Sequence, residues 1–255
     1  MLGVFDSGLG GLTALCELRR LRPDLDILYF GDTARVPYGT RSRETIIRYA
    51  REALGFLVSR GTDAILVACG TVSSVALPEL TPAFPVPLIG VVEPAALLAY
   101  HASKNRSIGI IATEATVESR AFETALHRLG RVTTCSLACP LFVSLAENGF
   151  TSPEDPVARE AVRHYLPPLR KTGIDTLILG CTHFPLLAPQ ISAALPGVRL
   201  IGAGEAAAAA MVAANPKVGH GELEVYVSDA PARFEKEAER LLGAPLPTKV
   251  QKYVL

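Results

Sequence analysis

Two stretches of closely similar sequence decide the fold. Residues 61–69 read GTDAILVAC, and residues 173–181, 112 positions later, read GIDTLILGC. Each contains a short apolar run, typical of a buried strand, with a cysteine directly after it. A second pair has the same offset: residues 88–93 read LIGVVE and residues 200–205 read LIGAGE. We infer an internal duplication that gives the chain two halves with the same plan.

Short apolar runs alternate with amphipathic stretches along the whole chain, which is the pattern of βα units and a parallel sheet. The predicted strands of the two halves are residues 2–5, 26–30, 64–68 and 88–91, then 107–111, 132–136, 176–179 and 199–201. Helical periodicity is clearest over residues 11–21, 42–59, 114–129 and 156–171. A strand at 223–227, a helix at 232–242 and a final extended piece complete the predicted elements.

These elements predict an α/β fold with two similar lobes related by duplication. Each lobe is a mostly parallel sheet flanked by helices, and the active site is expected in the cleft between them. The last predicted strand and helix are expected to return to the first lobe. We therefore predict one lobe from residues 1–95 and 207–255, and a second from residues 96–206.

Cys69 and Cys181 occupy the same place in the two halves, after a strand and before a predicted helix. Facing lobes would bring the two thiols to opposite walls of one cleft. Inverting an α-carbon needs a base on one face and an acid on the other, and cysteine suits both roles. Its ordinary pKa of about 8.5 lies near working pH, and a helix N-terminus can lower it. A lone cysteine is more often a small buried residue, but the matched positions favour catalysis.

The composition points to a small-molecule partner. Lys+Arg and Asp+Glu both number 25 in 255 residues, a balance that argues against nucleic-acid or acidic-membrane binding. No apolar run approaches the ~18 residues of a membrane span, and the opening residues lack the features of a signal peptide. Five cysteines do not form the even set of a disulfide framework. We expect a cytoplasmic protein.

The remaining candidate sites have simpler explanations. Cys16 lies in a helical apolar pattern, and Cys135 and Cys139 lack the second ligand pair of a zinc site, so we predict no metal. Residues 202–207, GAGEAA, satisfy a loose dinucleotide pattern, but too few residues follow to build a dinucleotide domain. No segment offers a convincing cofactor lysine, and no cofactor is predicted.

Four separated motifs resemble those of the glutamate racemase family. They are FDSGLGGL at 5–12, GDTARVPYG at 31–39, ACGT at 68–71 and GCTHFPLL at 180–187. The resemblance runs over nearly the whole chain, with the motifs in the family's order. It implies a two-lobed α/β fold and interconversion of L- and D-glutamate without pyridoxal phosphate, for bacterial peptidoglycan. Family members often form homodimers, which the resemblance leaves open for this chain.

The resemblance also implies roles for individual residues. Asp6 would assist Cys69, His183 would assist Cys181, and Glu147 would lie close to the second cysteine. The implied substrate-binding residues are Asp6, Ser7, Pro37, Tyr38, Gly39, Gly70, Thr71, Thr182 and His183. The residue types themselves support part of this assignment. The glycine turn at 6–11 and the Val36–Gly39 turn can present hydroxyl and N–H groups to carboxylates. A turn with a helix N-cap would explain the first segment equally well.

Gly70 departs from the family pattern, which has asparagine directly after the first cysteine. Glycine removes side-chain hydrogen bonds to a charged substrate, worth about 1.5–3 kcal/mol or roughly one to two decades in rate. Three alternatives follow: a racemase acting on aspartate or another amino acid, a weakened enzyme, or a binding protein that kept the cleft. A thiol hydrolase using Cys181 and His183 would leave Cys69 without a role.

Overall fold

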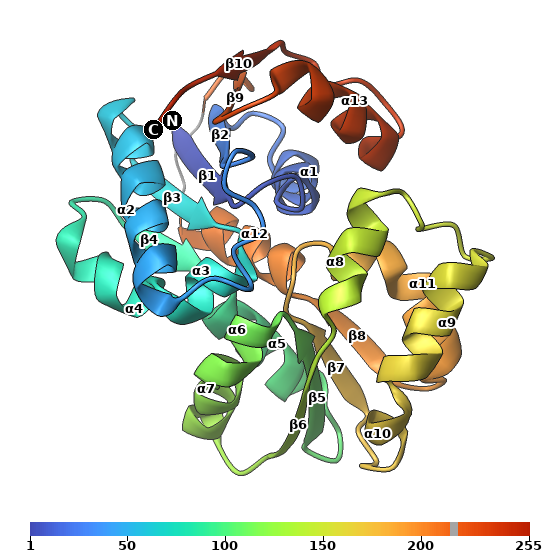
Figure 1. The fold of residues 1–255 in the computed structure, drawn as a ribbon. Helices are drawn as coiled ribbons and strands as arrows, with labels where there is room; N and C mark the ends of the chain where they lie inside the picture. The colour runs from blue at the N-terminus through green and yellow to red at the C-terminus, as the bar shows by residue number, and fades with distance from the viewer. Residues whose placement is uncertain (215–218) are drawn as a thin grey trace.

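The computed structural model describes residues 1–214 and 219–255. Ten strands in this part of the chain form two sheets, in which all neighbouring strands are parallel (Figure 1). The first sheet has the order β10-β9-β2-β1-β3-β4, with β1 (Leu2–Asp6), β2 (Ile27–Gly31), β3 (Ala64–Val67), β4 (Leu88–Gly90), β9 (Leu223–Val227) and β10 (Val250–Lys252). The second has the order β6-β5-β7-β8, with β5 (Ser107–Ala112), β6 (Thr133–Ala138), β7 (Thr176–Leu179) and β8 (Arg199–Gly202).

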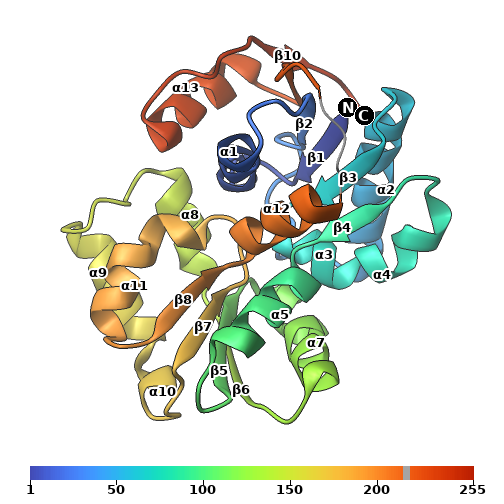
Figure 2. The same cartoon turned by 180° about the vertical axis from the view of Figure 1, so that it is seen from behind.

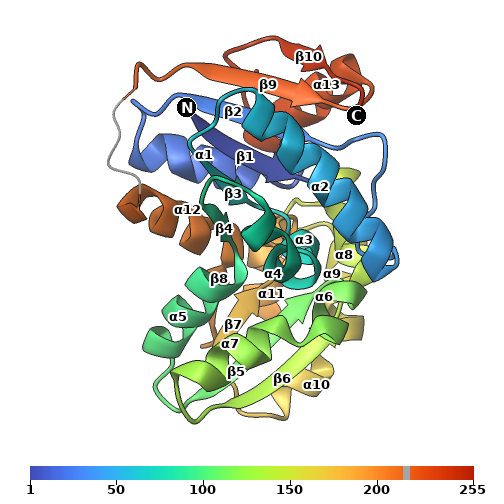
Figure 3. The ribbon, with the colours of Figure 1, turned by 90° about the vertical axis from the view of Figure 1, so that its left-hand side faces the viewer.

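The duplication read from the sequence is visible in this topology. Strands β2-β1-β3-β4 have the same order and direction as β6-β5-β7-β8. The predicted fold class, two α/β lobes with parallel sheets, is therefore confirmed. Strands β9 and β10 have no counterpart in the second sheet and extend the edge of the first. Together with α13 (Pro231–Leu242) they make the outer end of the first lobe (Figure 3).

Helices flank both sheets and follow the apolar periodicity of the sequence. The other helices are α1 (Leu12–Leu21), α2 (Arg43–Ser59), α3 (Gly70–Val75), α4 (Leu77–Leu80), α5 (Val92–Ala102), α6 (Glu114–Ser119), α7 (Ala121–Leu129), α8 (Pro140–Glu147), α9 (Pro156–Tyr165), α10 (Pro167–Arg170), α11 (Ala188–Ala194) and α12 (Ala203–Ala214). Local chemistry sets their starts: the Ser42 hydroxyl accepts from the Thr45 N–H at 3.3 Å, and Asp155 caps α9 in the same way. No helix in the described residues is long and apolar enough to cross a membrane.

Two predicted helices are each divided in the structure. The helix expected over 114–129 breaks at Arg120, whose φ of 53° lies in the left-handed region. The helix expected over 156–171 breaks at Leu166, because Pro167 has no N–H to continue the ladder. Both predictions were wrong in giving one continuous helix where the structure has two. Apolar periodicity does not reveal a break at a single residue.

The chain crosses between the lobes twice, in α5 and in α12. These two helices contact each other at the junction, on the face seen in Figure 2, and α12 also packs on α1. Gly204 brings α12 close to α1, because a Cβ there would lie 3.3 Å from the Ala14 Cβ. The 202–207 segment thus begins a packed helix. The lobe boundaries at residues 95/96 and 206/207 stay predictions.

The apolar core is continuous through the junction. One cluster joins buried residues of β1, β5 and α12, among them Val4, Ile110 and Ala207. Separate clusters fill the other face of each sheet, around Phe30 beneath α2 and around Phe142 of α8. The lobes are therefore fixed to one another by shared packing, which positions the two sheet edges for a common site.

Candidate active site

A cavity of about 360 Å³ lies between the lobes. The first lobe contributes Ser7, Gly8, residues 36–40 and residues 69–71. The second contributes Thr113, Glu114, Pro140, Leu141, Val143, Ser144, Glu147 and residues 181–183. All predicted site residues except Asp6 line this cavity, and its size suits a small metabolite.

Cys69 lies at the first-lobe wall, as the N-cap residue of α3 directly after β3 and Ala68. It is 5% exposed, and its Sγ lies 3.3 Å from the Ser7 Oγ. Burial, together with the charge of Asp6, raises the pKa of the Cys69 thiol to about 12. The Val72 N–H at the start of α3 lowers this pKa, as expected of a helix N-terminus, but desolvation outweighs it. The resting thiol is therefore protonated.

Asp6 ends β1 and is fully buried. Its Oδ2 accepts the Gly8 N–H at 2.9 Å, whereas Oδ1 has no hydrogen-bond partner in the described part of the chain. Burial raises the pKa of Asp6, although His183 and main-chain donors act against that rise. Asp6 therefore holds its proton more firmly than an exposed aspartate does.

Cys181 lies at the second-lobe wall, after β7 and Gly180. The predicted helix after it is a 3₁₀ turn at Phe184–Leu187, so Cys181 does not sit at an α-helix N-terminus. The His183 Nδ1 lies 3.6 Å from the Cys181 Sγ, and its Nε2 lies 3.2 Å from the Glu147 Oε1. The second contact is electrostatic, since Nε2 makes no aligned hydrogen bond.

The electrostatics of His183 depend on these two neighbours. Burial lowers the pKa of His183, but the contacts with Cys181 and Glu147 outweigh burial and raise that pKa to about 10. The imidazole is therefore protonated at neutral pH. The His183 cation therefore lies between the Cys181 thiol and the Glu147 carboxylate.

A buried carboxylate holds the 36–39 turn. The Tyr38 hydroxyl donates to the Asp32 Oδ2, and the Arg35 Nε donates to the same oxygen at 2.6 Å. Arg35 also lies over the Tyr49 ring, 4.1 Å from its centroid. Burial raises the pKa of Tyr38, which keeps its hydroxyl a donor. Asp32 was not predicted as a site residue, and a lone aspartate in a turn gives no signal of this role.

Gly70 lies against the backbone of the second lobe. A Cβ built on Gly70 would lie 2.0 Å from the Gly180 carbonyl oxygen. Beside it, the Thr71 Oγ1 lies 3.0 Å from the Thr113 Oγ1, and the Thr182 carbonyl accepts from Thr13 at 3.2 Å. A side chain at position 70, including the asparagine of the family pattern, would require these backbones to shift.

Thr113 lines the cavity and was missed from the sequence. A signal for it existed, because the Leu2–Val4 strand repeats at residues 108–110 with an offset of 106. With the same offset Thr113 corresponds to Ser7 in the sequence, so each lobe has a hydroxyl residue after its first strand, and both line the cavity.

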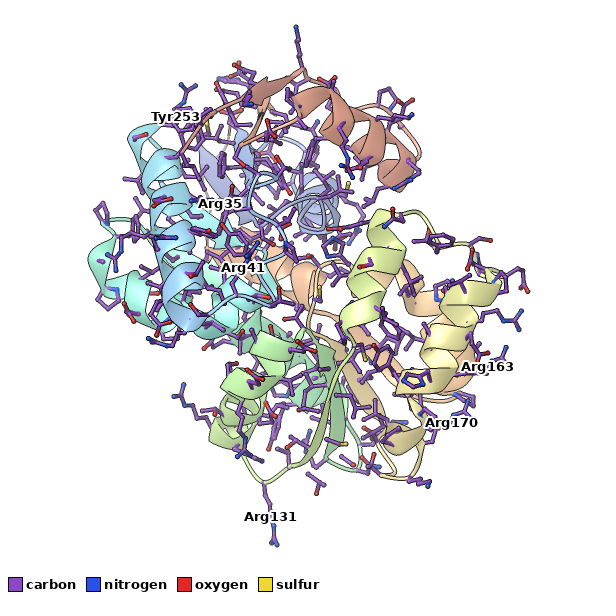
Figure 4. The ribbon with its side chains drawn as sticks, viewed as in Figure 1. Arg35, Arg41, Arg131, Arg163, Arg170 and Tyr253 are labelled. Atoms are coloured by element: carbon purple, nitrogen blue, oxygen red, sulfur yellow. The ribbon has the colours of Figure 1, made fainter. Side chains whose placement is uncertain are left out.

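The charges around the cavity are few. Among the described residues no arginine or lysine lines it, and Figure 4 shows Arg131, Arg163 and Arg170 at the outer edge of the second lobe. No cluster of three or more metal-binding side chains occurs in residues 1–214 and 219–255. All five cysteines are free. An anionic ligand would therefore be held by hydroxyl and N–H groups and by protonated His183.

The chain is similar over its whole length to known racemases. A family model described as Asp/Glu/Hydantoin racemase matches residues 11–211. The glutamate racemase of Aquifex aeolicus is 44% identical over 253 residues, which cover 99% of this chain and 98% of the relative. The crystal structure of a glutamate racemase isoform from Bacillus anthracis has a TM-score of 0.93 at 36% identity, covering 100% of this chain and 97% of that one.

Two further structures separate the branches of the family. Glutamate racemase from Francisella tularensis, solved in complex with D-glutamate, has a TM-score of 0.90 at 34% identity, covering 99% of this chain and 96% of that one. The aspartate racemase of Picrophilus torridus reaches a TM-score of 0.61 at 18% identity, covering 84% and 93%, a likeness of fold alone. The chain therefore belongs to the Asp/Glu/Hydantoin racemase family, in its glutamate racemase branch, and is an amino-acid racemase that acts without pyridoxal phosphate.

Proposed function

We propose that this chain interconverts L- and D-glutamate by two-base proton transfer between Cys69 and Cys181. One observation carries the proposal: duplicated cysteines at the carboxyl ends of β3 and β7 both line one cavity from opposite lobes. A substrate between them would present one face of its α-carbon to each sulfur. Racemisation needs that arrangement, whereas hydrolysis would use one thiol.

The proton transfers follow from the surroundings of the two thiols. The Cys181 thiolate, beside protonated His183, removes the α-proton of one enantiomer, and the electron pair is delocalised into the α-carboxylate. The Cys69 thiol, kept protonated by burial, delivers its proton to the opposite face. The roles reverse for the other enantiomer, so atoms and charge balance over each turnover.

The walls of the cavity supply donors for the two carboxylates of glutamate. Hydroxyls of Ser7, Thr71, Thr113 and Thr182 line it, beside the turn that Asp32 holds in place. Asp6 and Glu147 complete the proposed machinery: Asp6 acts electrostatically on Cys69, and Glu147 helps to keep His183 protonated. Fixed donors in the cleft favour the charge that develops at the α-carboxylate.

We further propose a cytoplasmic enzyme that supplies D-glutamate for peptidoglycan. The resemblance to glutamate racemases supports this role. Whether the chain complements a bacterial strain that requires added D-glutamate tests it directly.

The first experiment follows optical rotation and α-deuterium incorporation from D-glutamate in deuterated buffer, without added pyridoxal phosphate. We expect racemisation with deuterium entry in the wild type, and a loss of about 10²–10⁴-fold in Cys69→Ser and Cys181→Ser. Cys16→Ser, outside the cavity, is the matched control and should retain activity.

Other outcomes would redirect the assignment. Exchange with aspartate but not glutamate would indicate a sister specificity. If no amino acid exchanges its α-proton, the two-base proposal fails and a binding protein becomes the better explanation. Full activity in either catalytic cysteine variant would also contradict it.

A further inference from the structure

The C-terminus of α8 is completed by a side chain from the other lobe. The last four carbonyls of a helix lack partners within it. Here the carbonyls of residues 144–146 accept main-chain N–H groups of residues 148–150. The fourth, that of Glu147, accepts from the Arg240 guanidinium of α13. A cation at this position also suits the negative end of the helix dipole.

The turn after α8 leaves room for the guanidinium. Gly149 has a φ of 82°, and a Cβ on it would lie 3.1 Å from the Arg240 Cζ. A larger residue would be strained there and would crowd the guanidinium. Both lobes therefore contribute to the contact: one provides glycine in the turn, and the other provides arginine on the helix.

The residue held in this way is part of the proposed proton-transfer machinery. The Glu147 main chain contacts Arg240, and its side chain contacts the His183 Nε2 at 3.2 Å. His183 in turn contacts Cys181. We propose that Arg240 is a positioning residue, which fixes the last turn of α8 across the lobe junction and thereby holds Glu147 against His183. The inference rests on the proposed function, because it assigns Glu147 to the catalytic chain.

The other charged groups around Glu147 do not replace Arg240. His183 and Asp6 face it from the two sheet edges, and Arg233 lies near it on α13. Arg233 is engaged by Glu237 at 2.7 Å, one helical turn away. Arg240, in contrast to these three groups, donates to the backbone of α8.

Kinetics of Arg240→Ala give the first test. Arg240 is exposed, so truncation should leave the fold intact, which the unfolding temperature checks. We expect kcat to fall about three- to tenfold with a smaller change in KM, because one charge-assisted hydrogen bond positions a catalytic group. Arg240→Lys, which can still donate to a carbonyl, should recover most of the loss. Lys236→Ala, also exposed on α13, is the matched control and should match the wild type.

A second readout does not depend on turnover. The rate of iodoacetamide alkylation is followed against pH for the Cys181 and Cys69 peptides by mass spectrometry. If Glu147 loosens, His183 holds its proton less firmly, so the Cys181 profile of Arg240→Ala should move to higher pH. The Cys69 profile serves as the internal reference and should move much less, because Cys181 is a minor influence on its pKa.

The two readouts separate the two proposals. If the wild type racemises no amino acid but the Cys181 profile moves in Arg240→Ala, the proposed function fails and the positioning role stands. If Arg240→Ala keeps wild-type kcat and both alkylation profiles, the positioning role is refuted. An equal shift of both cysteine profiles would also overturn it, since that result indicates a general structural change.

Discussion

Adding one methyl group at Gly70 is expected to separate the lobes at the catalytic edge. The Cβ of Gly70→Ala would lie 2.0 Å from the Gly180 carbonyl oxygen, and 3.7 Å from the Cys181 Cα. Ordinary van der Waals contact begins at 3.4 Å. The two backbones must therefore move apart by 1.0 Å to pass the shortest contact seen for real Cβ atoms, 3.0 Å, and by 1.4 Å to reach ordinary contact at 3.4 Å. Neither atom is the end of a flexible side chain, so rotamer changes cannot absorb the shift.

The movement should affect catalysis more than stability. Overpacking of this kind typically costs about 1–3 kcal/mol of folding free energy. The same displacement separates Cys69, next to Gly70, from Cys181, next to Gly180. Misplacing reacting groups by about 1 Å can reduce the rate about 10²-fold. We therefore expect kcat to fall about 10²-fold in a protein that remains folded at 25 °C.

Deuterium exchange and thermal unfolding measured on the same samples test this prediction. Gly55→Ala is the matched control: Gly55 lies inside α2, and a Cβ there would meet nothing within 4 Å. It should stabilise the protein by about 0.5–1 kcal/mol with unchanged kcat. The Gly70→Asn variant distinguishes two effects of position 70 on kcat. A missing side-chain hydrogen bond predicts a gain of about one to two decades, whereas the steric argument predicts a loss. A gain, or wild-type kcat in Gly70→Ala, would refute the reasoning.

Two further predictions concern the partners of the cavity. Because the pKa of His183 is raised above its ordinary 6.5 to about 10, its stabilisation is fully present below pH 6.5 and is lost as pH rises through 10. His183→Gln should therefore reduce the free energy of unfolding by about 1–3 kcal/mol at pH 6 and by little above pH 10, as urea titrations at both pH values can determine. A difference that does not vary with pH would contradict the assigned protonation. Tyr38→Phe removes a donor to buried Asp32 and should raise the KM for glutamate about tenfold, with a smaller effect on kcat. Steady-state kinetics measure this, and an unchanged KM would show that the hydroxyl does not order the turn.

The overall architecture could be predicted because the two halves share short sequence patterns with a constant offset. The apolar runs ending at Cys69 and Cys181 indicated two strands, and their shared offset indicated two lobes. Helix continuity could not be predicted in the same way. The breaks at Arg120 and Leu166 depend on a single left-handed residue and on one absent N–H, which leave the average periodicity almost unchanged.

The candidate site was predictable where it follows strand ends and unpredictable where it depends on contacts between lobes. Ser7 and Cys69 follow strands, and the structure places both beside the cavity. Asp32 and Arg240 act through partners that only the folded chain brings near. The raised pKa of Cys69 could not be predicted either, because a helix-start motif does not show how deeply the thiol is buried.

The duplication supplies two equivalent cysteines, but it does not supply equivalent partners. Asp6 ends β1, whereas the corresponding residue at the end of β5 is Ala112. His183 follows Cys181 at the spacing at which Thr71 follows Cys69. Enantiomers in water have equal free energies, so this asymmetry cannot favour one product at equilibrium. It can only decide which proton transfer is slower, and the deuterium isotope effects measured from the two enantiomers should therefore differ.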